Sequence, residues 1–161
     1  MVTARQKRRL VVLAKKMIMK RGRNSYDGNG VASLFFKLTE SFGLKLTRHN
    51  DKTGTLSIFR RQRKAWRFGL GPYCFGFQEY QMKDMCGDVD SYFGYITEIV
   101  AVHSEHIGRA MGRRIIAATM QGKKLLRMLE TRIAFSFHDC HGNNLGVKNG
   151  QWVCIDFGID Y

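Results

Sequence analysis

The stretch that decides the fold reads FHDCHGNN at residues 137–144 and VCIDFG at residues 153–158. Three of its oxygen-bearing side chains are candidate ligands, Asp139, Asn144 and Asp156. Carboxylate and amide oxygens are the ligands that Mg²⁺ prefers, and one or two carboxylates plus phosphates complete its usual coordination. The stretch therefore predicts a site for Mg²⁺ and a nucleotide near the end of the sequence.

Residues upstream of this stretch offer groups that could hold phosphates. Gly28 and Gly30 lie in a Gly-Asn-Gly turn, and glycine lets backbone N–H groups approach a phosphate closely because it has no Cβ. Lys45 follows within an alternating apolar run at residues 42–47, which predicts a strand. The order of these groups suits a nucleotide that is held first at its phosphates and then at its metal.

Composition limits the class of protein. The 161 residues suffice for one domain or a small domain with a tail, and 44% of them are hydrophobic. Four cysteines occur without a CxxC pair, so free and mostly buried thiols are expected. We found neither an apolar run long enough for a membrane span nor a signal-peptide pattern. We therefore expected a cytoplasmic protein without membrane contact.

The charge is distributed unevenly along the chain. Residues 1–67 contain 18 Lys and Arg against 3 Asp and Glu, whereas residues 68–161 contain 9 against 10. A strongly basic half favours an acidic partner, such as nucleic acid, an acidic protein face or an anionic nucleotide. The alternative is a solvated basic surface that promotes solubility.

The N-terminal helix expected at residues 3–21 carries much of this charge. Leu10, Leu13 and Met17 can share one face of it, with Met19 as a further candidate. The pattern is compatible with two interpretations. The helix could dock onto an acidic partner, or it could pack on the domain and expose its basic face to solvent.

Periodicity and turn signals predict a mixed α+β chain. Ser104 was expected to cap a long helix in which Gly122 lies on the apolar seam, and Asn149-Gly150 was expected to form a tight hairpin turn. The expected elements beyond the first helix are a glycine-bearing loop followed by a hairpin within 25–48, a helix at 55–68, a strand at 73–77, a loop at 78–91, a strand at 92–102, a helix at 104–132 and a hairpin at 145–155.

These motifs resemble the protein-kinase-like superfamily. Asp139-Cys140-His141-Gly142-Asn143-Asn144 is similar to its Asp-x-His-x-x-Asn catalytic loop, and Asp156-Phe157-Gly158 matches its Asp-Phe-Gly motif. The combination with the Gly-Asn-Gly turn looks most like the early-expressed Ser/Thr protein kinases of lytic phages, which shut down host functions.

The resemblance implies ATP-Mg²⁺-dependent phosphotransfer to Ser or Thr of host proteins, in the host cytoplasm. It implies that Asp139 orients the substrate hydroxyl and accepts its proton, and that Lys45 pairs with phosphates. The other implied roles are Gly28, Gly30 and Ser33 covering the phosphates, Thr97 as gatekeeper with the Glu98 and Val100 backbone facing adenine, and Asn144 and Asp156 holding Mg²⁺.

The implied fold is a minimal kinase-like one. It has a basic N-terminal helix at 1–24, a small β-rich N-lobe with one helix at 25–102, and a reduced helical C-lobe at 103–161 that ends just after Gly158. The chain departs from the family where a helix glutamate should pair with Lys45; Gln62 and Glu40 are the nearest candidates. The histidine next to Asp139 also stands directly before it rather than two residues before.

Three other functions are compatible with the same residues. A kinase-like fold without activity could serve as a platform that binds and inhibits an acidic host protein or nucleic acid. A small-molecule phosphotransferase was the second. The third was a zinc or HNH-type nuclease site built from His138, Cys140, His141, Asn144 and Cys154.

Overall fold

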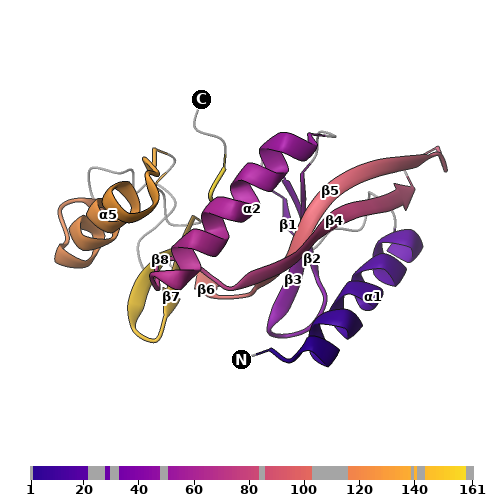
Figure 1. Ribbon diagram of the computed structural model, residues 1–161, viewed down its shortest axis with the longest axis horizontal. Coiled ribbons are helices and arrows are strands. Elements are labelled where there is room, and N and C mark those ends of the chain that lie inside the picture. Colours follow the sequence, from indigo (N-terminus) through magenta and orange to yellow (C-terminus); the bar gives the residue numbers. More distant parts are fainter. Residues whose placement is uncertain are drawn as a thin grey trace. The chain divides into compact units, whose positions relative to one another are not determined.

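The computed structural model describes residues 2–21, 28–29, 33–47, 51–83, 86–102, 116–138, 140 and 144–158. They form an α+β structure (Figure 1), which confirms the expected class. The chain divides into two compact units, Met1–Ser57 with Cys74–Ile99 and Ile58–Tyr73 with Val100–Tyr161. The division expected at residues 24 and 102 stays a prediction.

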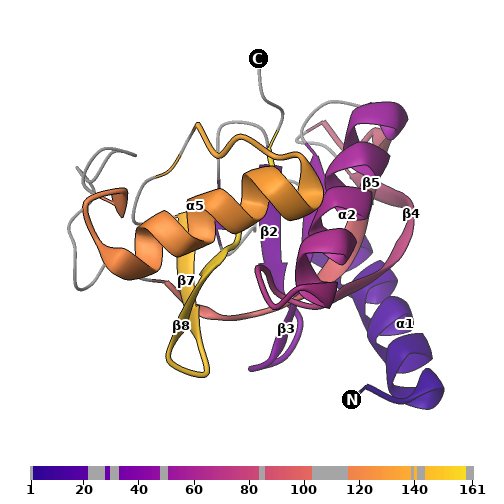
Figure 2. The same cartoon turned by 60° about the vertical axis from the view of Figure 1, so that its left-hand side comes forward.

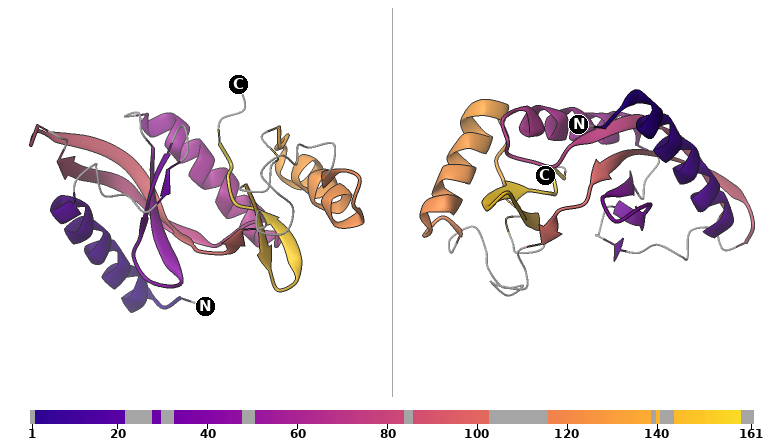
Figure 3. Two further views of the ribbon diagram at one scale, coloured as in Figure 1. Left: turned by 180° about the vertical axis from the view of Figure 1, so that it is seen from behind. Right: turned by 90° about the horizontal axis from the view of Figure 1, so that it is seen from below.

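The first unit is built on a five-stranded antiparallel sheet. Leu34 and Phe36 on one strand and Leu44 and Leu46 on the next are buried, because successive side chains of a strand point to opposite faces and one face packs inward. The strands lie in the order β1 (Gly28–Asn29), β2 (Ser33–Lys37), β3 (Phe42–Thr47), β5 (Val89–Glu98) and β4 (Cys74–Lys83) (Figures 1 and 3).

Helix α1 (Ala4–Arg21) packs along β4 (Figure 1). Its buried residues are Leu10, Ala14 and Ile18, which recur every four residues and so share one face. The expected face was wrong in part, since Leu13 is 38% exposed and Met19 is 44% exposed. The small side chain of Ala14 lets the helix approach the sheet closely. The prediction used only the larger apolar residues and so did not place Ala14 on the buried face.

The segment expected to be a loop at residues 78–91 is largely strand. β4 continues to Lys83 and β5 begins at Val89, so the loop prediction was wrong over most of this range. Tyr80 and Met82 are buried, whereas the intervening Gln81 is exposed and donates a hydrogen bond from Nε2 to Ser91 Oγ at 2.9 Å. The polar residues that suggested a loop lie on the exposed face of the β4–β5 hairpin, whose other face is buried.

Helix α2 (Lys52–Arg67) begins three residues before the helix expected at 55–68. Asp51 explains the earlier start, because its Oδ1 accepts a hydrogen bond from Gly54 N at 2.9 Å and so satisfies a backbone donor of the first turn. Buried Thr55 lies 2.6 Å, Oγ1 to Oγ1, from Thr47 of β3. Residues of α2 up to Ser57 belong to the first unit and later ones to the second.

The second unit contains a three-stranded antiparallel sheet in the order β6 (Ala101–Val102), β7 (Leu145–Lys148) and β8 (Gln151–Cys154). Its β7–β8 hairpin turns through Asn149 and Gly150, both with positive φ, 51° and 73° (Figure 3). Two positive φ angles are what a type I′ turn requires. The predicted Asn-Gly hairpin is therefore confirmed.

Helix α5 (Met120–Ile133) packs against β8 (Figure 2). The expected continuous helix over 104–132 was wrong at residues 117–119, where the chain turns; residues 103–115 lie outside the described part. Thr119 has extended backbone, and its side chain accepts a hydrogen bond from Gly122 N, so it caps a new helix. A Cβ on Gly122 would stand 1.9 Å from the Ile116 carbonyl oxygen. A glycine is therefore needed at residue 122 for the turn before α5. The predicted role of Gly122, on the apolar face of one long helix, is replaced by this one.

Candidate functional site

Lys45 lies in the middle of β3, and its side chain is partly exposed. Its backbone partners are Phe35 on β2 and Tyr95 on β5. Paired residues of antiparallel strands project from the same face of a sheet, and the face alternates along each strand. Lys45 therefore shares a face with Phe35, Tyr95 and, two residues further along β5, Thr97.

Helix α1 covers the opposite face of this sheet. A Cβ on Gly76 would meet Val11 Cγ2 of α1 at 3.2 Å and Ile96 Cδ1 of β5 at 4.0 Å. Ile96 lies between Tyr95 and Thr97 in sequence, so it projects from the face opposite to theirs. The first turns of α2 lie on the Lys45 side of the sheet. Thr55 of α2 contacts Thr47, and Thr47 is two residues after Lys45 in β3, so it projects from the same face.

Two residues of the predicted glycine-rich turn, Gly28 and Asn29, form strand β1 instead, so the turn prediction was wrong at these positions. Gly28 of β1 pairs with Phe35 of β2, and Ser33 of β2 pairs with Thr47 of β3. Ser33 therefore projects from the Lys45 face. Gly30 lies outside the described residues, so its predicted role is not located.

Thr97 stands next to the end of β5. It is 7% exposed and pairs with Gly43 of β3 on one side and Cys74 of β4 on the other. Glu98 ends the strand, and Ile99 N then donates a hydrogen bond to Ser41 O at 2.9 Å. The strand expected to run on through residue 102 is therefore interrupted after Glu98, because Ile99 bonds to the β2–β3 turn.

Val100 belongs to the second unit. Its Cγ2 lies 2.7 Å from the position that a Cβ on Gly146 would occupy, and Gly146 pairs with Val102. Val100 is thus packed against β7 at the entry to β6. The structure places Glu98 and Val100 in different units.

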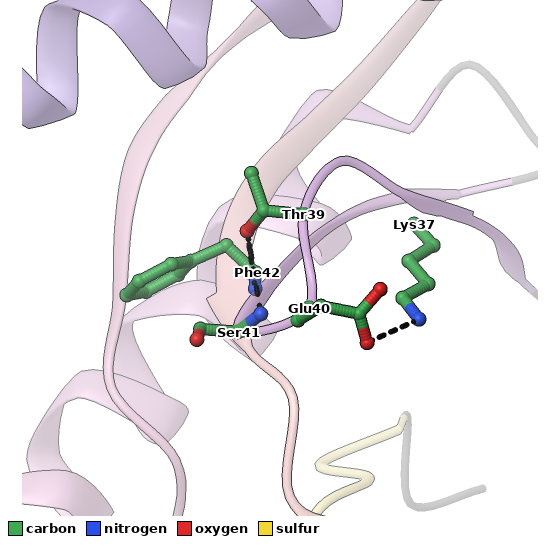
Figure 4. A network of polar contacts seen from close by, with 5 residues as sticks. All are labelled: Lys37, Thr39, Glu40, Ser41 and Phe42. Carbon is green, nitrogen blue, oxygen red and sulfur yellow. Dashed lines mark hydrogen bonds and ion pairs between the residues drawn. The ribbon is translucent and has the colours of Figure 1, made fainter.

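Both predicted substitutes for the missing helix glutamate have partners of their own. Glu40 forms an ion pair with Lys37 across the β2–β3 turn, 2.8 Å from Lys37 Nζ to Glu40 Oε2 (Figure 4). Thr39 holds the same turn, because its Oγ1 accepts hydrogen bonds from the backbone N–H groups of Ser41 and Phe42. The Glu40 side chain is 91% exposed, so this ion pair is a surface contact of small energetic value.

Gln62 takes a different place. It is 1% exposed, and its Nε2 donates to the Pro72 carbonyl oxygen at 3.4 Å within the second unit. Gln62 follows Thr55 by seven residues, so the two project from the same side of α2. The position is that of an inward-facing helix residue, but the amide carries no charge to neutralise a lysine.

The β7–β8 hairpin brings the backbone of Asn144 next to that of Ile155, the residue directly before Asp156. Asn144 immediately precedes β7 and is 8% exposed, and its carbonyl oxygen accepts a hydrogen bond from Ile155 N at 2.9 Å. The next pair of the ladder joins Leu145 and Cys154. Asp156 follows Ile155 directly, so its carboxylate stands one residue beyond this bond. Amide and carboxylate oxygens are ligands that Mg²⁺ prefers, so the two side chains are of the kind that a magnesium site uses.

Four hydrogen bonds anchor the backbone around Asp156. Cys154 N donates to Leu70 O at 2.9 Å, and Cys154 Sγ donates to Asp156 O at 3.0 Å. Arg61 of α2 adds a fork, with Nη1 donating to Phe157 O at 3.3 Å and to Gly158 O at 3.1 Å. The Arg61 guanidinium also lies 4.7 Å from the centroid of the Phe135 ring, a cation–π geometry.

The Phe157 side chain fixes the same segment from the other direction. It is fully buried and lies 5.4 Å, centroid to centroid, from Phe135. A Cβ on Gly71 would stand 2.9 Å from Phe157 Cζ, so a glycine is needed there for the ring to fit. Apolar burial of Phe157 and the Arg61 hydrogen bonds therefore leave the neighbouring Asp156 on a rigid backbone.

Asp139, the predicted catalytic residue, lies outside the described residues, as does His141. Of its neighbours, His138 is exposed and Cys140 is 2% exposed. Asp139 thus follows an exposed residue and precedes a buried one.

The zinc alternative uses two cysteines, Cys140 and Cys154, together with His141, which lies outside the described residues. Cys74, Cys140 and Cys154 are buried and Cys86 is exposed, all as free thiols, which confirms the expected state. Among the residues whose placement is described, no group of three His, Cys, Asp or Glu could hold a metal ion.

Arg61 is the residue of this region that sequence reasoning missed. It lies in the helix expected at 55–68, and no role was assigned to it from the sequence. A usable signal was its position four residues before Ala65, which is fully buried, because residues four apart lie on the same side of a helix. An arginine on the buried side of a helix needs partners, and here they are backbone carbonyls.

Comparison with known proteins adds no family. No protein-family model matches the chain, and no curated protein matches it. Within the described ranges, every helix is too short or too polar to cross a membrane.

Proposed function

We propose that the chain is a small Ser/Thr protein kinase of the protein-kinase-like superfamily that uses ATP and Mg²⁺. The observation that carries the proposal is the backbone hydrogen bond from Ile155 N to Asn144 O, which joins the last residue of one predicted motif to the residue directly before the next. In protein kinases these two positions, the catalytic-loop Asn and the Asp-Phe-Gly Asp, hold the metal ions.

The first unit supports the proposal through the position of its lysine. Protein kinases carry the phosphate-binding lysine on the third strand, and Lys45 lies on β3. Ser33 and Thr97 project from the same face of the sheet, and α1 covers the other face. A single helix, α2, connects β3 with β4 and touches the Lys45 face through Thr55.

Each residue then has a defined task. Bound Mg²⁺ would neutralise the charge that develops on the transferred phosphoryl group. Asn144 and Asp156 would hold it, and the Arg61 fork and buried Phe157 keep Asp156 in position. Lys45 would pair with phosphate oxygens, and Asp139 would accept the proton of the substrate hydroxyl. Host proteins remain the proposed substrates.

The second candidate function is a non-catalytic kinase-like platform that binds an acidic host protein or nucleic acid. The observation that favours it is the engagement of both substitutes for the helix glutamate, since Glu40 pairs with Lys37 and Gln62 with Pro72. Activation of protein kinases requires the ion pair between the strand lysine and that glutamate.

A phosphotransfer assay separates the two functions. The full chain is incubated with γ-³²P-ATP, Mg²⁺ and host lysate, and compared with Asp139→Asn, Asp156→Asn and the matched control Asp90→Asn, whose side chain is exposed on β5. A kinase predicts that Asp90→Asn labels like wild type and that the other two lose about 100-fold or more, because metal and base each contribute several kcal/mol.

Equal labelling by all four proteins would overturn the kinase proposal. Absence of labelling in wild type, together with a rise in melting temperature caused by ATP-Mg²⁺, would favour the platform.

A further inference from the structure

The solvent side of α1 exposes apolar side chains that the core does not use. Val12 is 51% exposed and Met19 is 44% exposed. The two are seven residues apart, which is two helical turns, so they share one stripe and lie about 10 Å apart along the axis. The contact with β4 is made by the other side of the helix, where Leu10, Ala14 and Ile18 are buried.

Cations frame these apolar side chains. The residues three and four positions before and after Val12 are its neighbours on the helix surface, and all four are basic and exposed. Lys15 and Lys16 also stand four and three positions before Met19. We call this set the cationic face of α1: Arg8, Arg9, Val12, Lys15, Lys16 and Met19.

Most charges in the first half of α1 oppose the stability of the helix; the exception is Lys7, whose Nζ lies 5.8 Å from the centroid of the Phe75 ring. Its sequence contains eight Lys and Arg and no acidic residue, including none in the first turn. Arg5 has Arg8 and Arg9 at three and four residues, and Lys16 has Lys20 at four, and such like-charge pairs destabilise a helix. Cations in the first turn also oppose the helix dipole. A purely structural helix would gain from acidic residues at several of these positions.

We propose that the cationic face of α1 is a docking surface for an acidic protein segment that also carries apolar side chains. Carboxylates of the partner would pair with Arg8, Arg9, Lys15 and Lys16. Its apolar side chains would cover Val12 and Met19 inside this frame, where burial adds affinity that charge alone does not supply. The proposal is independent of phosphotransfer, because no residue of the cationic face takes part in it.

The same residues argue against the two other polyanions. α1 contains no aromatic residue on which unpaired bases could stack, and a helix that reads duplex DNA presents polar side chains at the centre of its contact face, where this helix presents Val12 and Met19. A membrane-surface helix inserts its main apolar stripe, and in α1 that stripe, centred on Ala14, is buried in the protein.

Binding of defined probes to the full chain tests the proposal. The main probe is a fluorescent glutamate-rich peptide with two leucines seven residues apart, and its partner peptide has serine in place of both leucines. Single-stranded DNA, duplex DNA and phosphatidylserine vesicles are measured in the same buffer. We expect the leucine peptide to bind about tenfold more tightly than the serine peptide, and the affinity of both to fall with salt.

Variants of the protein make the test specific. Val12→Ser combined with Met19→Ser should weaken the leucine peptide about tenfold and leave the serine peptide unchanged. Arg8→Gln combined with Lys15→Gln should weaken both. Val89→Ser is the matched control, since Val89 is an apolar residue of β5 that is 52% exposed, and it should change neither. Circular dichroism melting curves check that the variants fold.

Three results would overturn the proposal. They are equal affinity for the two peptides, tighter binding of DNA or vesicles than of the leucine peptide, and an equal loss in Val89→Ser and in the Val12/Met19 variant.

Discussion

The two units of the chain are held together in different ways. In the first unit the stabilising contacts follow a sheet, and its polar contacts, such as Thr47 with Thr55, lie between adjacent elements. In the second unit the sheet has only three strands. There, contacts at single residues join distant parts of the chain, and the Arg61 to Phe157 bond spans 96 positions.

This difference decides how each unit should respond to mutation. A sheet spreads its hydrogen bonds over many residues, so the loss of one side chain is shared. A unit that depends on a few long-range contacts loses much of its stability when one of them is removed. The proposed metal ligands Asn144 and Asp156 both lie in the second unit, so disturbance there also reaches the candidate site.

The largest effect is expected at Arg61. Arg61→Met removes the fork to the Phe157 and Gly158 carbonyls and the contact with Phe135, and should lower the free energy of unfolding by about 2–3 kcal/mol. Arg60→Met is the matched control, because Arg60 is an exposed neighbour on the same helix, and it should change stability little. Urea unfolding curves measure both variants. Equal losses would show that the fork does not stabilise the second unit.

The next effect concerns the turn before α5. Gly122→Ala places a Cβ 1.9 Å from the Ile116 carbonyl oxygen, and relief of this overlap should cost about 1–3 kcal/mol. Alanine would otherwise favour a helix by about 1 kcal/mol. Gln121→Ala, at an exposed position of the same helix, is the control and should be neutral or stabilising. If Gly122→Ala unfolded at a higher urea concentration than wild type, residue 122 would not require glycine for the turn before α5.

Tyr80 provides a pH test of the first unit. The pKa of Tyr80 is raised to about 12. The main cause is burial of the side chain, and a hydrogen bond with Gln78 offsets part of this effect. The unfolded tyrosine ionises near its ordinary pKa of about 10. The stabilisation by the neutral side chain is therefore complete below pH 10 and is lost as the pH rises from 10 to 12.

The size of this loss is about 1 kcal/mol at pH 11. Unfolding free energies of wild type and Tyr80→Phe, measured at several pH values, isolate it because the other ionisable groups are common to both. A difference between the two proteins that stays constant from pH 9 to 12 would show that Tyr80 does not carry this pH dependence.

The smallest effect compares the two helix caps. Asp51→Ala removes the acceptor for Gly54 N at the start of α2, and Thr119→Ala removes the acceptor for Gly122 N at the start of α5. Each should cost about 1 kcal/mol. Thermal unfolding measures both, with Thr131→Ala as the control at an exposed site in α5. A much larger loss for Thr119→Ala would mean that this residue holds the turn as well as the cap.

Much of the candidate site could be predicted from local sequence. Lys45 was expected in a strand and lies in one, and Asn149-Gly150 was expected to form a tight hairpin turn and does so. The common face of Ser33, Lys45 and Thr97 could not be predicted, because it depends on which strands pair and in which register. The interruption of the strand after Glu98 likewise depends on Ser41, which is far away in sequence.

The sequence by itself determined the features that obey short-range rules: strand alternation, the hairpin turn, the free cysteines and the basic character of the N-terminal half. Only the tertiary structure decided that Ala14 rather than Leu13 faces the sheet, that the chain turns at residues 117–119, and that Arg61 holds the backbone after Asp156. Short-range rules reflect backbone geometry within a few residues. The other outcomes depend on partners that distant segments supply, and a single sequence does not show which partners will meet.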